Sequence, residues 1–306
     1  MNNENWTSTK EFYMLPFFFK SNFSSLFHFL LFYLFLCVVF INTVIIILIY
    51  ISNHLHTPMY FFLCNLSIVD ICYTTVIVPN LLFMYLSGNN TISFCKCFIQ
   101  MYFYLLAGGM EGILILVMAF DRCVAICNPL HYHSILSKKN CFLLMTACWI
   151  VGGYNSFLMT FEASKLHFCN STAIHQFFCD IKALINIACS NLQHVYNIIY
   201  IELLVFGFFP FICSLVSYIK IIKVILKINS TEGRQKAFST CSSHLTVILM
   251  YYICVSSTNM MPTYLNVPEQ ICSVIYTVVT PMINPLIYSL RNNDVKKALK
   301  KLFDVI

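Results

Sequence analysis

Hydrophobic residues are arranged along this chain in long runs that are separated by short polar clusters. A helix needs about 20 apolar residues to cross a hydrocarbon core about 30 Å thick, and these runs are long enough. Because backbone groups in lipid must be hydrogen-bonded within their own segment, the runs predict helices rather than strands. The predicted helices cover residues 26–51, 58–86, 96–127, 140–162, 195–227, 236–260 and 269–290. The pattern therefore predicts an all-α integral membrane protein, built as a bundle of seven transmembrane helices.

The end of the chain has a different pattern. From Val295 to Phe303, apolar side chains lie near one helical face and lysines on the other. A helix of this kind lies on a membrane surface, where its basic side chains reach anionic lipid. The predicted organisation is an N-terminal segment over residues 1–25, a membrane domain over 26–290 and a tail over 291–306 that carries the amphipathic helix.

The composition agrees with a chain that is covered by lipid. Of the 306 residues, 59% are hydrophobic and only 10% are charged, whereas an average soluble domain has about 25% charged residues. A soluble fold with so few charges could not cover its own surface. The net charge of +6 does not indicate nucleic acid here, because the charges gather on one side of the predicted membrane.

Lysine and arginine residues set the orientation, because they concentrate on the cytoplasmic side of a membrane. With the N-terminus outside, five of the 18 (Lys10, Lys20, Lys96, Lys165 and Lys182) fall outside, which leaves 13 inside. The N-terminus is therefore expected to be extracellular, and the first span rather than a cleavable signal peptide is expected to direct insertion. Asn5 is the preferred glycosylation acceptor among the Asn-x-Ser/Thr sites of the outer segments.

Five of the 16 cysteines fall in or beside the outer loops, which face an oxidising compartment. They are Cys95, Cys97, Cys169, Cys179 and Cys189. Residue spacing alone leaves their connectivity open.

Several polar residues stand in or at the ends of apolar spans, where a charge costs at least about 2.5–3.5 kcal/mol. They are Asn42, Asp70, Glu111, Asp121, Arg122, Glu202, His244 and Asn284. Each is expected to face the bundle interior with a partner. Asp70 and Glu111, with Asn42 and Asn284 nearby, could share a sodium ion or a proton; the alternative is that both carboxyl groups are protonated and inert.

Two prolines, Pro210 and Pro285, stand inside the fifth and seventh spans. Proline removes a backbone donor and bends a helix, so both are expected to act as pivots. Pivots in mid-membrane suit a receptor and a transporter equally.

The run Met-Ala-Phe-Asp-Arg-Cys-Val-Ala-Ile-Cys-Asn-Pro-Leu over residues 118–130 resembles the end of the third span of vertebrate olfactory receptors. These are rhodopsin-like G-protein-coupled receptors. Further runs with the family's spacing cover residues 55–63, 236–245 and 281–292, and Thr-Pro-Met-Tyr in the first of them is typical of the tetrapod-type group. The resemblance implies a receptor for small organic odorants that activates a stimulatory, olfactory-type G protein, at the plasma membrane of sensory-neuron cilia.

The resemblance also implies roles for single residues. Asp121 and Arg122 resemble the pair that holds the cytoplasmic end of the third span closed, until the arginine is freed toward Tyr218. The implied switch residues are Asp121, Arg122, Tyr218, Lys236, His244, Asn284, Pro285 and Tyr288. The implied disulfides join Cys97 to Cys179 and Cys169 to Cys189, with Cys95 left as a surplus thiol.

Several positions depart from the family's pattern, and one of them is Gln176 of the outer loop, which stands where histidine is common. Cys123 replaces the tyrosine of Asp-Arg-Tyr, Ile41 stands where glycine usually precedes Asn42, and Ile253 replaces a glycine of the sixth span. These departures bear on coupling and on the floor of the pocket. A non-olfactory chemosensory receptor or a weakly coupled orphan receptor is the alternative interpretation.

Helical spacing from the family motifs places a ligand pocket in the outer half of spans three, five and six. The candidates are Tyr104, Leu105, Gly108, Gly109, Glu202, Leu203, Phe206, Tyr252, Val255 and Asn259. Gly108 and Gly109 leave room either for a ligand or for close helix packing. Glu202 could select a cationic or hydrogen-bond-donating ligand, although pairing within the bundle is the favoured interpretation. Apart from Glu202 the lining is mostly apolar, which suits a small organic molecule.

Other classes of protein fit less well. The His54/His56 and His131/His133 pairs lack the further ligands that a membrane di-iron enzyme requires. The seventh span has no lysine for a retinal Schiff base, and no internal repeat indicates a transporter. The expected partners are an odorant, a heterotrimeric G protein and membrane lipid; no metal site, enzyme activity or cofactor is expected, apart from a sodium ion near Asp70 and Glu111.

Overall fold

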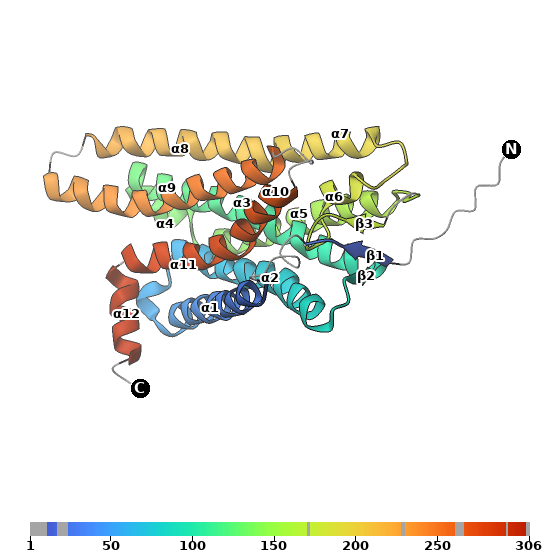
Figure 1. Cartoon of the computed structure of the whole chain (residues 1–306). Helices are drawn as coiled ribbons and strands as arrows, with labels where there is room; N and C mark the ends of the chain where they lie inside the picture. The colour runs from blue at the N-terminus through green and yellow to red at the C-terminus, as the bar shows by residue number, and fades with distance from the viewer. Residues whose placement is uncertain are drawn as a thin grey trace.

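A computed structural model of the chain describes residues 11–16, 24–169, 172–227, 230–260, 266–291 and 293–303. Long helices run side by side through most of the molecule (Figure 1). The first four long helices are α1 (Ser24–Ile51), α2 (Pro58–Ser87), α3 (Phe94–Cys127) and α5 (Lys138–Ser164). Short helical turns, η2 (Asn53–Leu55), η3 (Pro129–His131) and α4 (Tyr132–Ile135), connect them. In the second half of the bundle, α8 (Phe209–Ile225) and α9 (Thr231–Met260) both pack against α3, as do α2 and α5.

The predicted helical membrane bundle is confirmed. Six helical segments of the described chain are long and apolar enough to cross a membrane, by length and composition. The remaining predicted span, 236–260, lies in α9, whose apolar part is the shorter stretch His244–Ser257. This part is shorter than the predicted span because residues 236–243, with which the span begins, are mostly polar. Helix α9 itself begins at Thr231.

The fifth and seventh spans each contain a π-helical segment. In the fifth, α7 (Gln193–Glu202) continues through η4 (Leu203–Phe208) into α8; in the seventh, α10 (Asn266–Val274) continues through η5 (Ile275–Val279) into α11 (Thr280–Arg291). Each segment ends just before a proline: Phe209 donates its backbone N–H to the carbonyl of Leu204, and Thr280 donates to Ile275. A proline lacks the N–H that would continue the α-helical ladder, which accounts for these wider turns. The irregular turn of span seven therefore precedes Pro281, one turn before the expected pivot at Pro285, which lies inside α11.

A small sheet covers one end of the bundle, in the order β2–β1–β3. Strand β1 (Glu11–Met14) pairs antiparallel with β2 (Thr91–Ser93) and parallel with β3 (Ala173–Ile174). Phe12 and Met14 are fully buried beneath it, and the Phe12 ring packs 5.1 Å from that of Phe168. The predicted all-α fold did not include this sheet. We call this end of the bundle the sheet end.

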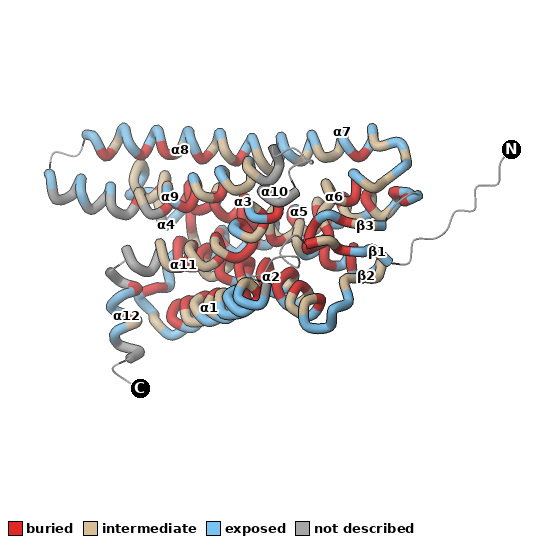
Figure 2. The backbone as a smooth tube through the Cα atoms, in the orientation of Figure 1, coloured by how far each residue is buried: buried red, intermediate tan, exposed pale blue. Residues whose placement is uncertain are grey.

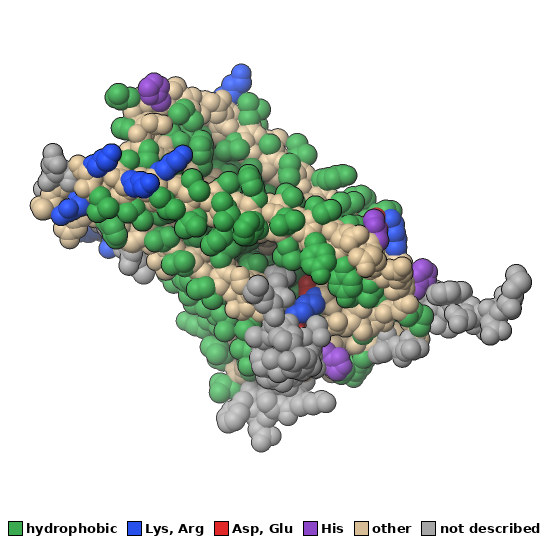
Figure 3. Space-filling view, turned by 90° about the horizontal axis from the view of Figure 1, so that it is seen from above, with side chains coloured by type: hydrophobic (Ala, Val, Ile, Leu, Met, Phe, Trp, Pro, Cys, Tyr) green, Lys and Arg blue, Asp and Glu red, His purple; other side chains and the backbone are tan. Residues whose placement is uncertain are grey.

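Apolar side chains are exposed on the outside of the bundle and polar ones are buried inside it, the reverse of a soluble protein. The exposed apolar residues include Phe29 (70%), Phe40 (69%) and Phe142 (65%). Figure 2 shows the exposed outer faces of the helices, and Figure 3 shows hydrophobic side chains over much of one face. Asn42 and Asp121 are fully buried. This distribution is that of a bundle surrounded by lipid.

The end of the bundle opposite the sheet end carries a group of exposed lysines. Lys220, Lys223 and Lys227, on the last turns of α8 and just after it, are exposed, and Figure 3 shows Lys and Arg side chains gathered at that end. Helix α12 (Asn293–Phe303) lies across the ends of the other helices (Figure 1). Its Val295 and Ala298 are buried, while Lys296, Lys297 and Lys300 are exposed, which is the amphipathic pattern expected from the sequence.

Candidate functional site

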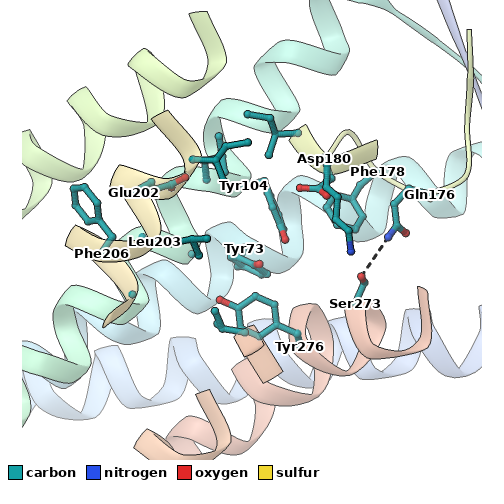
Figure 4. A pocket seen from close by; sticks show the side chains of 18 of the residues that line it. Tyr73, Tyr104, Gln176, Phe178, Asp180, Glu202, Leu203, Phe206, Ser273 and Tyr276 are labelled. Carbon is teal, nitrogen blue, oxygen red and sulfur yellow. Dashed lines mark hydrogen bonds between the residues drawn. The ribbon is translucent and has the colours of Figure 1, made fainter. Parts of the chain in front are cut away.

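A cavity of about 160 Å³ lies between the helices, toward the sheet end (Figure 4). Its wall comes from α2, α3, α7, η4, α9, α10, η5 and the loop that includes the short helix α6 (Ile181–Ile185). Eight of the ten predicted pocket residues line it: Tyr104, Leu105, Gly108, Gly109, Glu202, Leu203, Phe206 and Val255. The side chain of a ninth, Asn259, lies outside the described part of the chain.

Tyr252 is the exception among the predicted pocket residues. Its ring packs 4.8 Å from that of Phe211 on α8, in the interface between α8 and α9. The neighbouring residue Tyr251 lines the cavity instead, together with Val255 one turn later. Because one residue turns a helix by about 100°, a shift of one position moves a side chain from the cavity to the helix interface. Ile253, with 63% of its surface exposed, points away from the bundle and does not form the pocket floor.

The two adjacent glycines of α3 leave space in the cavity wall. A Cβ atom at Gly109 would meet nothing within 4 Å, and one at Gly108 would lie 3.6 Å from the hydroxyl of Tyr276. Close helix packing at either position would place a neighbouring helix against the added atom. The geometry therefore favours room for a ligand over tight packing at Gly109.

An aromatic group forms the inner wall of the cavity, and most of its members are not among the residues predicted from the sequence. The ring of Tyr73 on α2 lies 5.3 Å from that of Tyr104 and 5.4 Å from that of Tyr276. The ring of Phe178 lies 4.7 Å from that of Tyr104, and Tyr251 lies beside Tyr276 at 6.3 Å. Figure 4 shows Tyr73, Tyr104 and Tyr276 grouped in the cavity. These rings give the site flat, polarisable surfaces.

Charged residues line the same cavity. Glu202 accepts a hydrogen bond from the amide of Asn155 at 3.3 Å, and Lys182 forms an ion pair with Glu269 at 2.9 Å. Asp180 also lines the wall. Burial raises the pKa of the Asp180 carboxyl to about 6; the Glu269 carboxylate adds to this rise, and Lys182 opposes it.

The loop over the cavity is tied down by a disulfide and by amide side chains. Cys97 at the start of α3 is joined to Cys179, whose backbone N–H donates to Gln100 at 3.0 Å. Gln176 donates to Ser273 at 3.4 Å (Figure 4). Gln270 donates to the carbonyls of His175 and Leu15 at 2.9 and 3.4 Å, and so connects α10 to the loop and to the N-terminal segment.

The other expected disulfide, between Cys169 and Cys189, is also present in the structure, within the loop itself. Cys95 is a free, exposed thiol. The expected glycosylation acceptor, Asn5, lies outside the described residues.

A second polar group lies deeper in the bundle. The amide of Asn284 donates to Asp70 at 3.3 Å and to Glu111 at 3.2 Å, so the three side chains from α11, α2 and α3 are brought together. Asn42 donates instead to the carbonyls of Pro281 and Val38. One oxygen of Asp70 and the side-chain oxygen of Asn42 have no hydrogen-bond partner among the described residues. Within that part of the chain, no group of three or more His, Cys, Asp or Glu side chains could hold a metal ion.

At the opposite end of the bundle, Asp121 is held by two neighbours. The guanidinium of Arg122 donates to Asp121 at 2.8 Å, and the hydroxyl of Tyr132 donates to its other oxygen at 2.7 Å. Tyr132 is not among the residues predicted from the sequence. Burial and the Asp121 carboxylate raise the pKa of the Tyr132 phenol above its usual value, so this residue remains a donor.

The remaining switch candidates are distributed around this pair. Tyr218 lies 2.8 Å from the imidazole of His244 and donates to the carbonyl of Cys241 at 3.3 Å. It is therefore bonded to α9 and not to Arg122 in this conformation. The sulfur of Cys123 lies 4.0 Å from that of Cys127, one turn further along α3. The side chains of Lys236 and Tyr288 lie outside the described part.

Comparison with known proteins places this chain beside members of a single family. A family model described as "Olfactory receptor" matches residues 29–305. The chain is 41% identical to human "Olfactory receptor 2L3" over 304 residues, covering 99% of this chain and 97% of that protein. It is 44% identical to human "Olfactory receptor 2T10" over 278 residues, 90% and 89% of the two chains. It is 41% identical to "Olfactory receptor 1" of Rattus norvegicus over 305 residues, 99% and 97% of the two chains.

Proposed function

The chain belongs to the olfactory receptor family, and from this premise we propose that its cavity binds a small organic odorant and that the opposite end of the bundle activates a stimulatory heterotrimeric G protein. The protein is an odorant receptor and a multi-pass membrane protein, and it is not an enzyme. The proposal adds where the ligand binds, which residues respond to it and how the chain is oriented in the membrane.

The cavity among α3, η4, α9 and η5 is the observation that carries the proposal. Its volume of about 160 Å³ is close to the roughly 150 Å³ of an engineered protein cavity that binds benzene. The aromatic wall and the short row of polar groups supply what a small organic ligand needs for affinity and orientation. The ligand-binding residues are Tyr104, Leu105, Gly108, Gly109, Glu202, Leu203, Phe206 and Val255, with Tyr73, Tyr251 and Tyr276 in addition.

The route from the cavity to the opposite end passes through the two π-helical segments. Both η4 and η5 contribute side chains to the cavity wall, and each is continuous with a helix, α8 or α11, that runs to the opposite end. An occupied cavity shifts these wide turns and so moves α8 and α11 relative to α3, and α9 moves with α11, against which it packs. Movement of α9 breaks the contact of Tyr218 with His244 and allows Arg122 to leave Asp121. Lys236, Asn284, Pro285 and Tyr288 belong to the same proposed switch.

We further propose that Asp70 and Glu111 hold one positive charge between them in the inactive receptor. Two observations support this assignment: one oxygen of Asp70 has no hydrogen-bond partner in the described part of the chain, and Asn284 shares its amide between the two carboxyl groups. A sodium ion and a proton both supply that charge. A sodium ion predicts that receptor stability depends on sodium at constant ionic strength, whereas a proton predicts that it does not.

The sheet end is proposed to face outside, with Asn5 glycosylated and residues 1–25 extracellular. The exposed lysines of α8 and α12 then lie in the cytoplasm, where basic residues concentrate, and residues 291–306 form the cytoplasmic tail. Residues 26–290 form the membrane domain. The plasma membrane of sensory-neuron cilia is the proposed location.

A cyclic-AMP reporter assay tests the proposal. Cells that express the full-length receptor with an olfactory-type stimulatory G protein are exposed to a panel of odorants. We expect a response that Arg122→Ala abolishes and that Lys165→Ala, a charge change at the exposed sheet end, leaves intact. Surface expression of both variants is measured in the same cells. Uptake of ligand into cells that lack the G protein, without any cyclic-AMP response, would overturn the assignment.

A further inference from the structure

The charges around the cavity do not balance. Among the described residues that line it are three carboxyl groups, those of Asp180, Glu202 and Glu269, and one basic residue, Lys182. Lys182 is paired with Glu269 at 2.9 Å. The cavity therefore carries an excess of acidic groups that a positively charged ligand would complement.

Glu202 is the acidic group of the cavity whose hydrogen-bond partner is neutral. It is the last residue of α7, directly before η4, and it accepts a hydrogen bond from the amide of Asn155 at 3.3 Å. An amide is neutral, so this bond orients the carboxyl group without neutralising it. A cationic ligand would satisfy the remaining acceptor capacity of this side chain with a charge-assisted hydrogen bond.

The aromatic wall favours the same kind of ligand. A cation is attracted to the face of an aromatic ring within about 6 Å of its centre, and cages of such rings recognise ammonium groups. Figure 4 shows Tyr104 between Glu202 and Asp180, with Tyr73 and Tyr276 beside it. Ring-to-ring distances of 5.3 and 5.4 Å place these three tyrosines in one wall, so an ammonium group beside Glu202 would also meet aromatic faces.

We propose that this cavity selects a small amine in its protonated form, whose ammonium group binds Glu202 and whose hydrocarbon part packs against the tyrosines. This inference rests on the proposed function, since it names the ligand class of the same cavity. Asp180 adds negative charge on the other side of Tyr104. The cavity volume of about 160 Å³ restricts the ligand to a single small ring or a short alkyl chain.

A matched pair of ligands separates the effect of ligand charge on affinity from the effect of ligand shape. Cyclohexylamine and cyclohexanol have the same ring and differ in the group that meets Glu202. Their affinities are measured by calorimetry on the purified full-length receptor in lipid nanodiscs. We expect the amine to bind the wild-type receptor about tenfold or more tightly than the alcohol, the ratio expected for one additional charge-assisted contact.

Three variants test which carboxyl group is responsible for the preference for the amine over the alcohol. Glu202→Gln keeps an acceptor for Asn155 and is expected to lose the preference for the amine while retaining alcohol binding. Asp180→Asn is expected to weaken amine binding by a smaller factor. Glu162→Gln, which changes a carboxyl group paired with Lys165 outside the cavity, is expected to leave both affinities unchanged. Melting temperatures without ligand show whether each variant is folded.

The outcomes distinguish this inference from the proposed function. Equal or tighter binding of the alcohol by the wild-type receptor overturns the inference, as does failure of both probes and of shorter alkylamines to bind. A cyclic-AMP response to neutral odorants alone also overturns it, while leaving the receptor assignment in place. Amine binding that Glu202→Gln abolishes, without any cyclic-AMP response, supports the inference and contradicts the proposed coupling.

Discussion

A methyl group on Gly112 would lie 2.5 Å from the hydroxyl oxygen of Tyr251. Glycine at this position of α3 therefore provides the space into which Tyr251 of α9 extends, and the Tyr251 hydroxyl donates to the carbonyl of Gly108 at 3.4 Å. This contact connects α9, which must move on activation in the proposed function, to the wall of the ligand cavity.

Gly112→Ala is expected to displace Tyr251 and to destabilise the receptor. Overpacking of a well-packed interior costs about 1–3 kcal/mol, so the melting temperature of the purified receptor should fall. Gly109→Ala is the matched control on the same helix, because a Cβ there meets nothing within 4 Å. Equal melting temperatures for the two variants would contradict this account of Gly112.

Tyr132→Phe is expected to raise basal signalling. The hydroxyl of Tyr132 donates to Asp121 at 2.7 Å, and a hydrogen bond to a charged group contributes about 1.5–3 kcal/mol. Its loss weakens the hold on the Asp121–Arg122 pair, so basal cyclic AMP per receptor at the cell surface should increase several-fold. Tyr154→Phe, at a residue that is 66% exposed on α5, serves as the control. Unchanged basal signalling in Tyr132→Phe would show that this bond does not restrain Arg122.

Substitutions of Cys95 and Cys97, two cysteines at the start of α3, are expected to have different effects on surface expression. Cys97→Ser removes the disulfide to Cys179, and loss of a native disulfide typically costs about 2–5 kcal/mol. Surface expression, measured by flow cytometry on intact cells, should drop sharply. Cys95→Ser changes a free, exposed thiol and should leave expression as it is. The reverse result would mean that Cys95, and not Cys97, bonds Cys179.

A permanently charged ligand is expected to bind less tightly as the pH falls below about 6. The pKa of Asp180 is raised to about 6 by burial and by Glu269. This carboxyl group is therefore ionised at pH 7.5 and becomes protonated as the pH falls through about 6. Protonation removes negative charge beside Lys182, Glu202 and Tyr104, and so weakens attraction for a cation. Tetramethylammonium is the probe, because its own charge does not change with pH. Calorimetric titrations from pH 7.5 to pH 5 should show a smaller pH dependence in Asp180→Asn; an equal dependence would mean that another group titrates.

The sequence was sufficient to predict the membrane bundle and most of the cavity on α3 and α7–η4, because hydropathy marks spans and family motifs set the helical register. The sequence was insufficient where the packing of the helices determines which side chains reach the cavity. Tyr73 and Tyr276 reach the cavity from spans two and seven, and their direction depends on how those helices are rotated in the bundle. The choice between Tyr251 and Tyr252 depends on a rotation of one residue. Strand β1, four residues long, is too short to produce a clear alternating pattern.

The claim that the odorant binds in this cavity is tested most directly by filling the cavity and measuring whether odorant recognition is lost while coupling remains. Gly109→Leu places a large side chain in space that is empty around this residue, so it should raise the odorant concentration required for half-maximal cyclic AMP by about tenfold or more, the equivalent of about 1.4 kcal/mol. Surface expression and basal cyclic AMP should match the wild-type receptor. An unchanged concentration–response curve in a receptor that is expressed normally would contradict the claim that this cavity is where the odorant binds.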